Sequence, residues 1–184
     1  MTHLLIVDWT SALFVIDDAF GQHGVLPSFM AYAAARMAGA DPPGSGTGFD
    51  AAFDDLWSRT TAALPPPLAA RAARQLLEYG RAVADEEACG GHPQAPSPAR
   101  ILEIHRIDTA LRFYFTLIEA GMGCCLDPAA VAATGTAELA ALEHIALVND
   151  LFSYRKEHYA GRKGAEAQPT EAKAKGGQHS GANR

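Results

Sequence analysis

Val-Asn-Asp-Leu-Phe-Ser-Tyr-Arg-Lys-Glu, residues 148–157, places three oxygen-bearing side chains at a helical spacing. Asn149, Ser153 and Glu157 stand at positions i, i+4 and i+8. Because an α-helix turns by about 100° per residue, these positions drift by only about 40° and share one face. Helical side chains lean toward the N-terminus of the helix, so Glu157 reaches back toward the two shorter side chains. The stretch therefore predicts a helix with an amide oxygen, a hydroxyl and a carboxylate in one stripe.

The donors in this stripe suit one kind of metal ion. All three are hard oxygen donors, which Mg²⁺ prefers, but they are too few to form a complete cage. Mg²⁺ in proteins usually keeps waters and takes its remaining ligands from a substrate phosphate. A solvated polar stripe on an amphipathic helix has the same pattern, and the chemistry of the residues leaves both interpretations open.

Length and composition are those of one globular domain. The chain has 184 residues, of which 48% are apolar and 20% charged, enough to bury a core. Its net charge of −6 gives no reason to expect nucleic acid as a partner. The same charge would repel a diphosphate unless cations bridged the two.

Cysteine usage indicates a reducing compartment. The chain has three cysteines, Cys89, Cys124 and Cys125, of which two are adjacent. An odd number with this spacing does not form a disulfide framework, so we expect the protein in the reducing cytoplasm. The first twenty residues are apolar, but they lack a basic leader and contain Asp8. We therefore expect neither a signal peptide nor contact with a membrane.

Apolar periodicity predicts an all-α helical bundle. The predicted helices are 3–18, 27–38, 49–63, 67–87, 98–120 and 128–157. From residue 158 onward there is no Val, Ile, Leu, Met, Phe or Trp. We therefore expect a helical domain at 1–157 and a disordered polar tail at 158–184.

Two aspartates end the first predicted helix. Asp17 and Asp18 directly follow an apolar run, where buried carboxylates would be costly without a counter-charge. Acids at a helix C-terminus also oppose the helix dipole. A solvated helix end is one interpretation, and a bound metal ion would relieve both problems.

The amino-acid sequences of both stretches resemble motifs of a known family. Asn-Asp-Leu-Phe-Ser-Tyr-Arg-Lys-Glu resembles the second metal motif of class I terpene synthases, in the form that bacterial and fungal enzymes use. Residues 8–20, Asp-Trp-Thr-Ser-Ala-Leu-Phe-Val-Ile-Asp-Asp-Ala-Phe, resemble the helix that carries the first metal motif. The resemblance extends from about residue 3 to Tyr159 and implies a partial class I terpenoid synthase fold.

The resemblance implies a set of magnesium ligands. Asp17 takes the place of the main ligand in the first motif, and Asp18 the place that usually supports it. Asn149, Ser153 and Glu157 complete the set, which holds three Mg²⁺ ions in an intact family member. A further acid normally follows the first motif, and Gly21 and Gln22 occupy those places here, so the full metal cluster is in doubt.

A second group of positions corresponds to the part of the family that contacts the diphosphate. His105 and Arg106 stand where the family has an Arg-Arg pair whose first member senses the diphosphate. Asp108 and Thr109 fill the linker and effector positions at a helix break. A neutral His cannot make the two-pronged contact of a guanidinium. Arg106 either substitutes after a rotation or pairs with a local carboxylate such as Glu103 or Asp108.

Other positions follow from the same resemblance. Arg155 and Lys156 precede the triad glutamate and are expected near the diphosphate. Phe14 and Phe113 are candidates for the wall of a terpenoid cavity, where aromatic rings stabilise carbocations, although core packing is the default for such rings. Asp54-Asp55 is a second aspartate pair, but it lies in what resembles a non-catalytic helix.

Family domains are longer at both ends, so we expect a chain truncated at both ends. A bundle that lacks wall helices exposes apolar faces and invites partners, a homodimer among them.

The leading hypothesis is a Mg²⁺-dependent terpene cyclase that ionises a prenyl diphosphate, with farnesyl diphosphate as the default substrate. The alternative is a catalytically impaired or inactive fragment that keeps the fold and binds Mg²⁺ and pyrophosphate. A third is a helical interaction module whose motifs are accidental.

Overall fold

The computed structural model describes residues 2–17, 24–90 and 96–166, with side chains described as far as Phe152. The chain divides into two compact units, Met1–Ala146 and Leu147–Arg184, which are treated separately below. The described residues contain no strand, which confirms the predicted all-α class. Their helices are α1 (Thr2–Val15), α2 (Leu26–Met37), α3 (Asp50–Ala63), α4 (Pro66–Gly90), α5 (Pro98–Asp108), α6 (Leu111–Gly121), α7 (Pro128–Ala133) and α8 (Gly135–Glu166).

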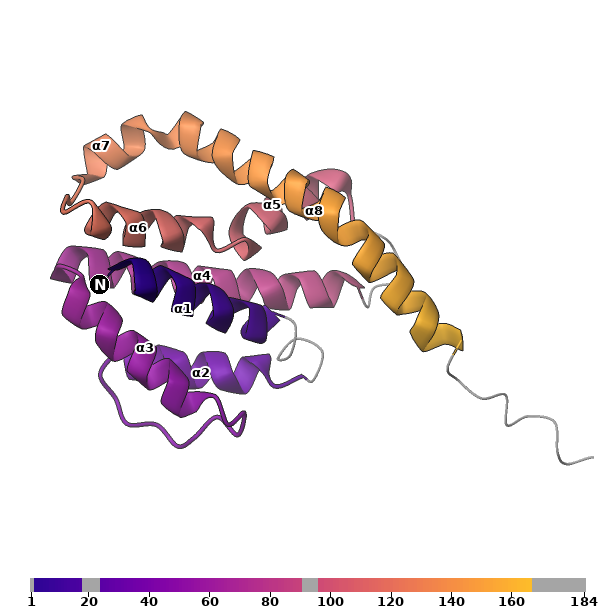
Figure 1. The fold of residues 1–184 in the computed structure, drawn as a ribbon, viewed down its shortest axis with the longest axis horizontal. Helices are drawn as coiled ribbons and strands as arrows, with labels where there is room; N and C mark the ends of the chain where they lie inside the picture. Colours follow the sequence, from indigo (N-terminus) through magenta and orange to yellow (C-terminus); the bar gives the residue numbers. More distant parts are fainter. Residues whose placement is uncertain (1, 18–23, 91–95, 167–184) are drawn as a thin grey trace, which may run out of the picture. The chain divides into compact units, whose positions relative to one another are not determined.

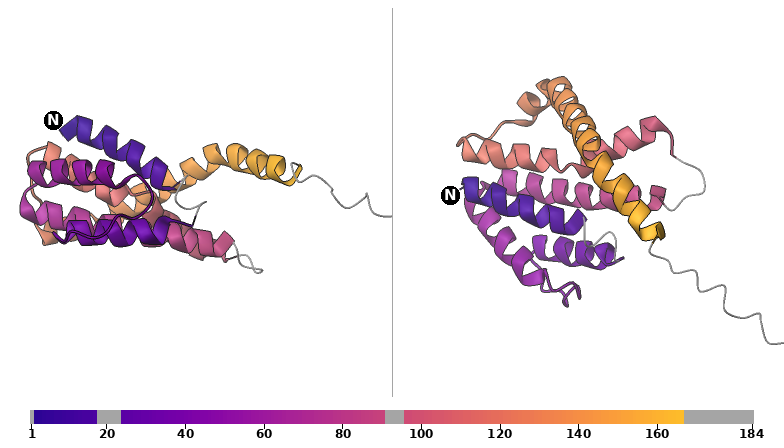
Figure 2. Two further views of the ribbon diagram at one scale, coloured as in Figure 1. Left: turned by 90° about the horizontal axis from the view of Figure 1, so that it is seen from below. Right: turned by 45° about the vertical axis from the view of Figure 1, so that its right-hand side comes forward.

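Helix α4 is the centre of the first unit. It packs against α2, α3, α5 and α6, and α1 packs against α3 and α6 (Figures 1 and 2). Two helices begin at residues whose side chains cap them. Ser97 and Asp127 each cap a helix by accepting a hydrogen bond from a backbone N–H three residues on, with proline in the first turn.

Trp9 lies at the middle of the core. It has no exposed surface, and its ring makes edge-on contacts with Phe113 at 5.0 Å and Phe53 at 6.1 Å between centroids. Its Nε1–H donates a hydrogen bond of 2.8 Å to Thr60 Oγ1, which in turn donates to the carbonyl of Leu56. Trp9 thereby joins α1, α3 and α6 through the packing of its ring and through its buried hydrogen bond to Thr60.

The predicted helix 98–120 is wrong in one respect, because it is two helices. Helix α5 ends at Asp108, and Ala110 adopts a left-handed conformation with φ 55° before α6 begins. A left-handed non-glycine residue costs about 1–2 kcal/mol, so the surrounding packing holds this break in place. Ala110 is buried and small, which lets the chain turn inside the bundle.

The predicted helix 128–157 begins where the structure has it, but it differs from the structure in its interior and at its C-terminal end. It is divided at Thr134 into α7 and α8, and α8 continues to Glu166. The predicted disordered tail is therefore helical over 158–166, because Glu, Lys, Arg and Ala favour helix without large apolar side chains. Residues 167–184 lie outside the described residues.

Thr60→Val tests the buried pair in the core. The substitution keeps the shape but leaves the indole N–H of Trp9 without its acceptor, so we expect a loss of about 1–3 kcal/mol in the free energy of unfolding. Urea unfolding followed by circular dichroism measures it. Thr61→Val, one position along on the exposed face, is the matched control and should change stability by less than about 0.5 kcal/mol. Equal effects of the two variants would contradict the assignment.

Candidate functional site

Tyr79 of α4 connects this helix with the end of α1. Its side chain projects from α4 into the core, and its Oη donates a hydrogen bond of 3.2 Å to the carbonyl of Leu13 in α1. Burial raises the pKa of Tyr79, and the negative charges of Asp17 and Asp108 raise that pKa further. Both carboxylates therefore act on the same phenol, although one follows α1 and the other ends α5. Asp17 itself is exposed, and Asp18 lies outside the described residues.

The break between α5 and α6 coincides with the predicted linker and effector positions. Asp108 is the last residue of α5, and Thr109 lies in the turn that leads to Ala110. The hydroxyl of Thr109 and the Nε of Arg106 are buried atoms without a hydrogen-bond partner in the described structure. Polar atoms of this kind are uncommon in native interiors and often mark a functional place.

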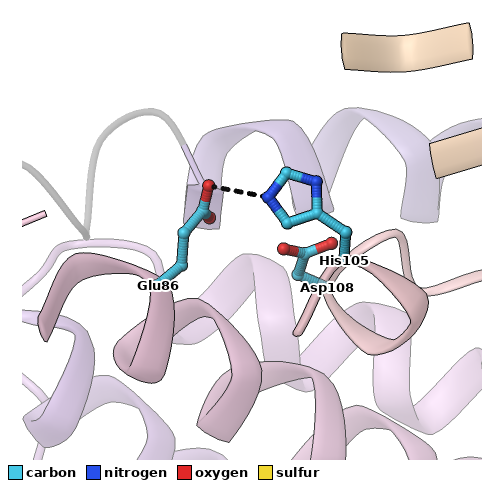
Figure 3. Close-up of side chains that lie close together, drawn as sticks. All are labelled: Glu86, His105 and Asp108. Atoms are coloured by element: carbon cyan, nitrogen blue, oxygen red, sulfur yellow. Dashed lines mark ion pairs between the residues drawn. The ribbon is translucent and has the colours of Figure 1, made fainter. Parts of the chain in front are cut away.

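Figure 3 shows a cluster of an imidazole and two carboxylates beside this break. Glu86 comes from α4, and His105 and Asp108 come from α5. The Nε2 of His105 lies 3.7 Å from Glu86 Oε1, and one ligand atom from each of the three residues falls within 4.8 Å of the others. His105 and Asp108 are half-buried, and Glu86 is exposed.

The predicted triad lies on one helix of the second unit. Positions 149, 153 and 157 all belong to α8, so the helical register that places them on one face is confirmed. Asn149 is exposed, and the side chains of Ser153, Arg155, Lys156 and Glu157 lie outside the described residues. Asp17 belongs to the first unit, so its approach to the triad through metal ions stays a prediction.

Comparison with known proteins decides the family. A family model described as terpene synthase family 2, C-terminal metal binding, matches residues 8–167 and spans both predicted metal motifs. The chain belongs to the terpene synthase family. The resemblance carried by the two motifs is thereby confirmed, and with it the all-α terpene synthase fold. A search of curated proteins finds no match. Within the described part of the chain, no helix is long and apolar enough to cross a membrane.

In this terpene synthase-family chain, Arg106 has a partner that the sequence did not indicate. It forms a half-buried ion pair with Glu143 of α8, within the first unit. The predicted local partner Glu103 instead binds Arg100, with 2.8 Å between Glu103 Oε2 and Arg100 Nη1. Arg106 is therefore paired with a carboxylate, but with one on α8 instead of the local Glu103 or Asp108 that the sequence offered, and its contact with a diphosphate stays a prediction.

The two aromatic candidates lie in different environments. Phe113 is buried against Trp9 and belongs to the core, the default that the sequence left open. Phe14 is 63% exposed on α1. Their role as walls of a terpenoid cavity stays a prediction.

The second aspartate pair has a structural role. Asp54 accepts hydrogen bonds of 2.9 Å from Tyr32 Oη and Arg36 Nε, and Asp55 pairs with Arg59 at 2.8 Å. Each carboxylate is neutralised by an arginine, which agrees with the interpretation of this helix as non-catalytic.

A pocket of about 500 Å³ lies elsewhere in the first unit. It is bordered by α4, α6, α7 and the first turns of α8, and none of the predicted site residues with described side chains lines it. Arg71 and Glu119 form a largely buried ion pair in its wall, with 2.6 Å between Nη1 and Oε2. The carboxylate of Glu119 also accepts from the backbone N–H of Leu126, so the pair stabilises the turn after α6.

Sequence reasoning missed Glu86. It stands in the run Asp85-Glu86-Glu87 at the end of a helix, which was the available signal. Its contact with His105 connects two helices across a loop, so periodicity within one helix could not reveal it.

Tyr79→Phe tests the position of the buried phenol. Because the pKa of Tyr79 is raised in the folded state, the folded protein keeps a proton above pH 10 that the unfolded chain releases. Stability should therefore fall with rising pH above 10, by up to about 1.4 kcal/mol per pH unit more in the wild type than in Tyr79→Phe. At neutral pH the variant should lose about 1 kcal/mol for the missing hydrogen bond. Urea unfolding at pH 8, 10 and 11 measures both effects, and parallel pH profiles would refute the first.

Proposed function

We propose that this chain is a Mg²⁺-dependent class I terpene cyclase that ionises a prenyl diphosphate, farnesyl diphosphate by default. The observation that carries the proposal is the family match over residues 8–167, which includes Asp17 at the end of α1 and the triad in register on α8. Exposed Asp17 and Asn149 present hard oxygen donors, which fit Mg²⁺.

The proposed roles divide between metal ligands and diphosphate contacts. Asp17, supported by Asp18, would hold the ions from one helix, and Asn149, Ser153 and Glu157 would hold them from the other. Bound Mg²⁺ neutralises the charge of the leaving diphosphate. Three bound Mg²⁺ ions are part of the proposal.

The basic side chains and the helix break have roles of their own in the proposal. Arg155 and Lys156 would bind phosphate oxygens directly. Arg106 could bind phosphate only by giving up its ion pair with Glu143. Asp108 and Thr109 would face the reacting carbon skeleton from the break after α5, and the ring of Phe14 would stabilise positive charge along the path of cyclisation.

We also propose that the enzyme works in the cytoplasm. Its three cysteines are all free thiols, as a reducing compartment favours. A homodimer is the proposed assembly, because Leu147, Val148, Leu151 and Phe152 expose apolar side chains on the second unit.

Release of inorganic diphosphate from farnesyl diphosphate tests the activity. We expect release that requires Mg²⁺ and stops with a chelator, together with cyclic hydrocarbon products in gas chromatography. Asp17→Asn and Asn149→Ala should each lower turnover by about 100-fold or more, since each removes charge stabilisation of the leaving group. Asp55→Asn, on the arginine-paired aspartate, is the matched control and should keep wild-type turnover. Absence of release from a folded, monodisperse sample would contradict the proposal.

Two observations favour the second candidate, a remnant that binds but does not turn over. His105 stands where the family has its sensor arginine, and Arg106 is already paired with Glu143. Calorimetry with Mg²⁺ and pyrophosphate separates the candidates. Binding without turnover supports the remnant, and measurable turnover excludes it.

A further inference from the structure

Glu86, His105 and Asp108 bring three possible metal ligands within 4.8 Å of one another. Two ligand atoms that each lie about 2.1 Å from one ion are at most about 4.2 Å apart. The His105 Nε2 to Glu86 Oε1 distance of 3.7 Å is within that limit. The Asp108 carboxylate lies beside the His105 ring (Figure 3). The Glu86 side chain is exposed, so it can move to bring its carboxylate closer to a bound ion.

The surroundings of the cluster are negative. Asp108 is the last residue of α5, where the helix dipole adds partial negative charge. Burial chiefly raises the pKa of Tyr79 in α4, and the negative charges of Asp17, Asp108 and Glu86 raise it further. The arginines of α5 bind other carboxylates: Arg106 pairs with Glu143, and Arg100 pairs with Asp85 and Glu103. A cation would be stabilised here.

We propose that Glu86, His105 and Asp108 bind one divalent transition-metal ion, such as Mn²⁺, Co²⁺ or Zn²⁺. An imidazole nitrogen favours these ions over Mg²⁺, and two carboxylates supply the compensating negative charge. None of the three residues belongs to the Asp17 or Asn149/Ser153/Glu157 sets, and a bound ion would replace the substrate contacts that the resemblance implies for His105 and Asp108. Three protein ligands leave coordination positions open for water or for an anionic oxygen.

A metal site and a simple ion pair require different protonation states of His105. In an ion pair the imidazole is protonated and donates to Glu86, whereas a metal ligand must be the neutral ring with Nε2 bound to the ion. A spectroscopic signature of nitrogen bound to the metal therefore separates the two arrangements.

The experiment uses the full chain with Mn²⁺ alone, in the absence of any diphosphate. Pulsed electron paramagnetic resonance of bound Mn²⁺ should show coupling to an imidazole ¹⁴N nucleus in the wild type. His105→Gln should remove that coupling. Glu86→Gln should weaken Mn²⁺ binding at least about tenfold, because even residues that only orient a metal ligand have effects of this size. Glu86 is exposed, so its variant should fold as the wild type does.

Two controls separate this site from others. His144→Gln removes an exposed histidine of α8, and Asp17→Asn removes the first motif, and both variants should retain the nitrogen coupling. The proposal is overturned if the folded wild type shows no coupling at millimolar Mn²⁺, or if the coupling persists in His105→Gln. Because no prenyl substrate is present and turnover is not measured, neither result depends on whether the chain is an active cyclase.

Discussion

Trp9 supplies the contact on which the arrangement of the first unit depends. Its ring fills the space where α1, α3 and α6 meet, and its only polar atom is satisfied by Thr60 inside the core. Burying so large a side chain fixes the rotation of α1 about its own axis. That rotation determines where Asp17 emerges at the end of the helix. Core packing and the position of Asp17 are thus set by the same residue.

The sequence predicted the class of fold because apolar residues recur at helical spacing in every segment. It could not predict which side of α1 would be buried. Residues 3–18 are apolar on most sides, but Leu5, Trp9, Leu13 and Ile16 turn inward whereas Leu4 and Phe14 are exposed. A helix that is apolar on most sides does not reveal its partner, so only packing against α3 and α6 selects the inner face. The break at Ala110 was implied by the resemblance, which puts a helix break at Asp108 and Thr109, but apolar periodicity did not reveal it. It lacks glycine or proline, and tertiary packing imposes its left-handed backbone.

In the candidate site, too, the sequence predicted relations within one helix but not contacts between helices. The register of residues 149, 153 and 157 follows from helix geometry, so the sequence predicted it correctly. The partners of His105 and Arg106 do not, because Glu86 and Glu143 lie on other helices. Sequence spacing identifies groups that share a helix face, whereas charges that meet across helices appear only after the chain has folded.

The ties between α8 and the rest of the first unit are largely electrostatic. Arg106 meets Glu143 and Arg112 meets Glu138, both partly exposed to water, whereas the fully buried apolar contacts of α8 are limited to Leu142 and Ala146 among the described residues. Ion pairs in such positions are weakened by dissolved salt, and apolar contacts are not. The first turns of α8 are consequently the segment whose amide hydrogens should exchange with solvent sooner in concentrated salt, while those around Trp9 stay protected.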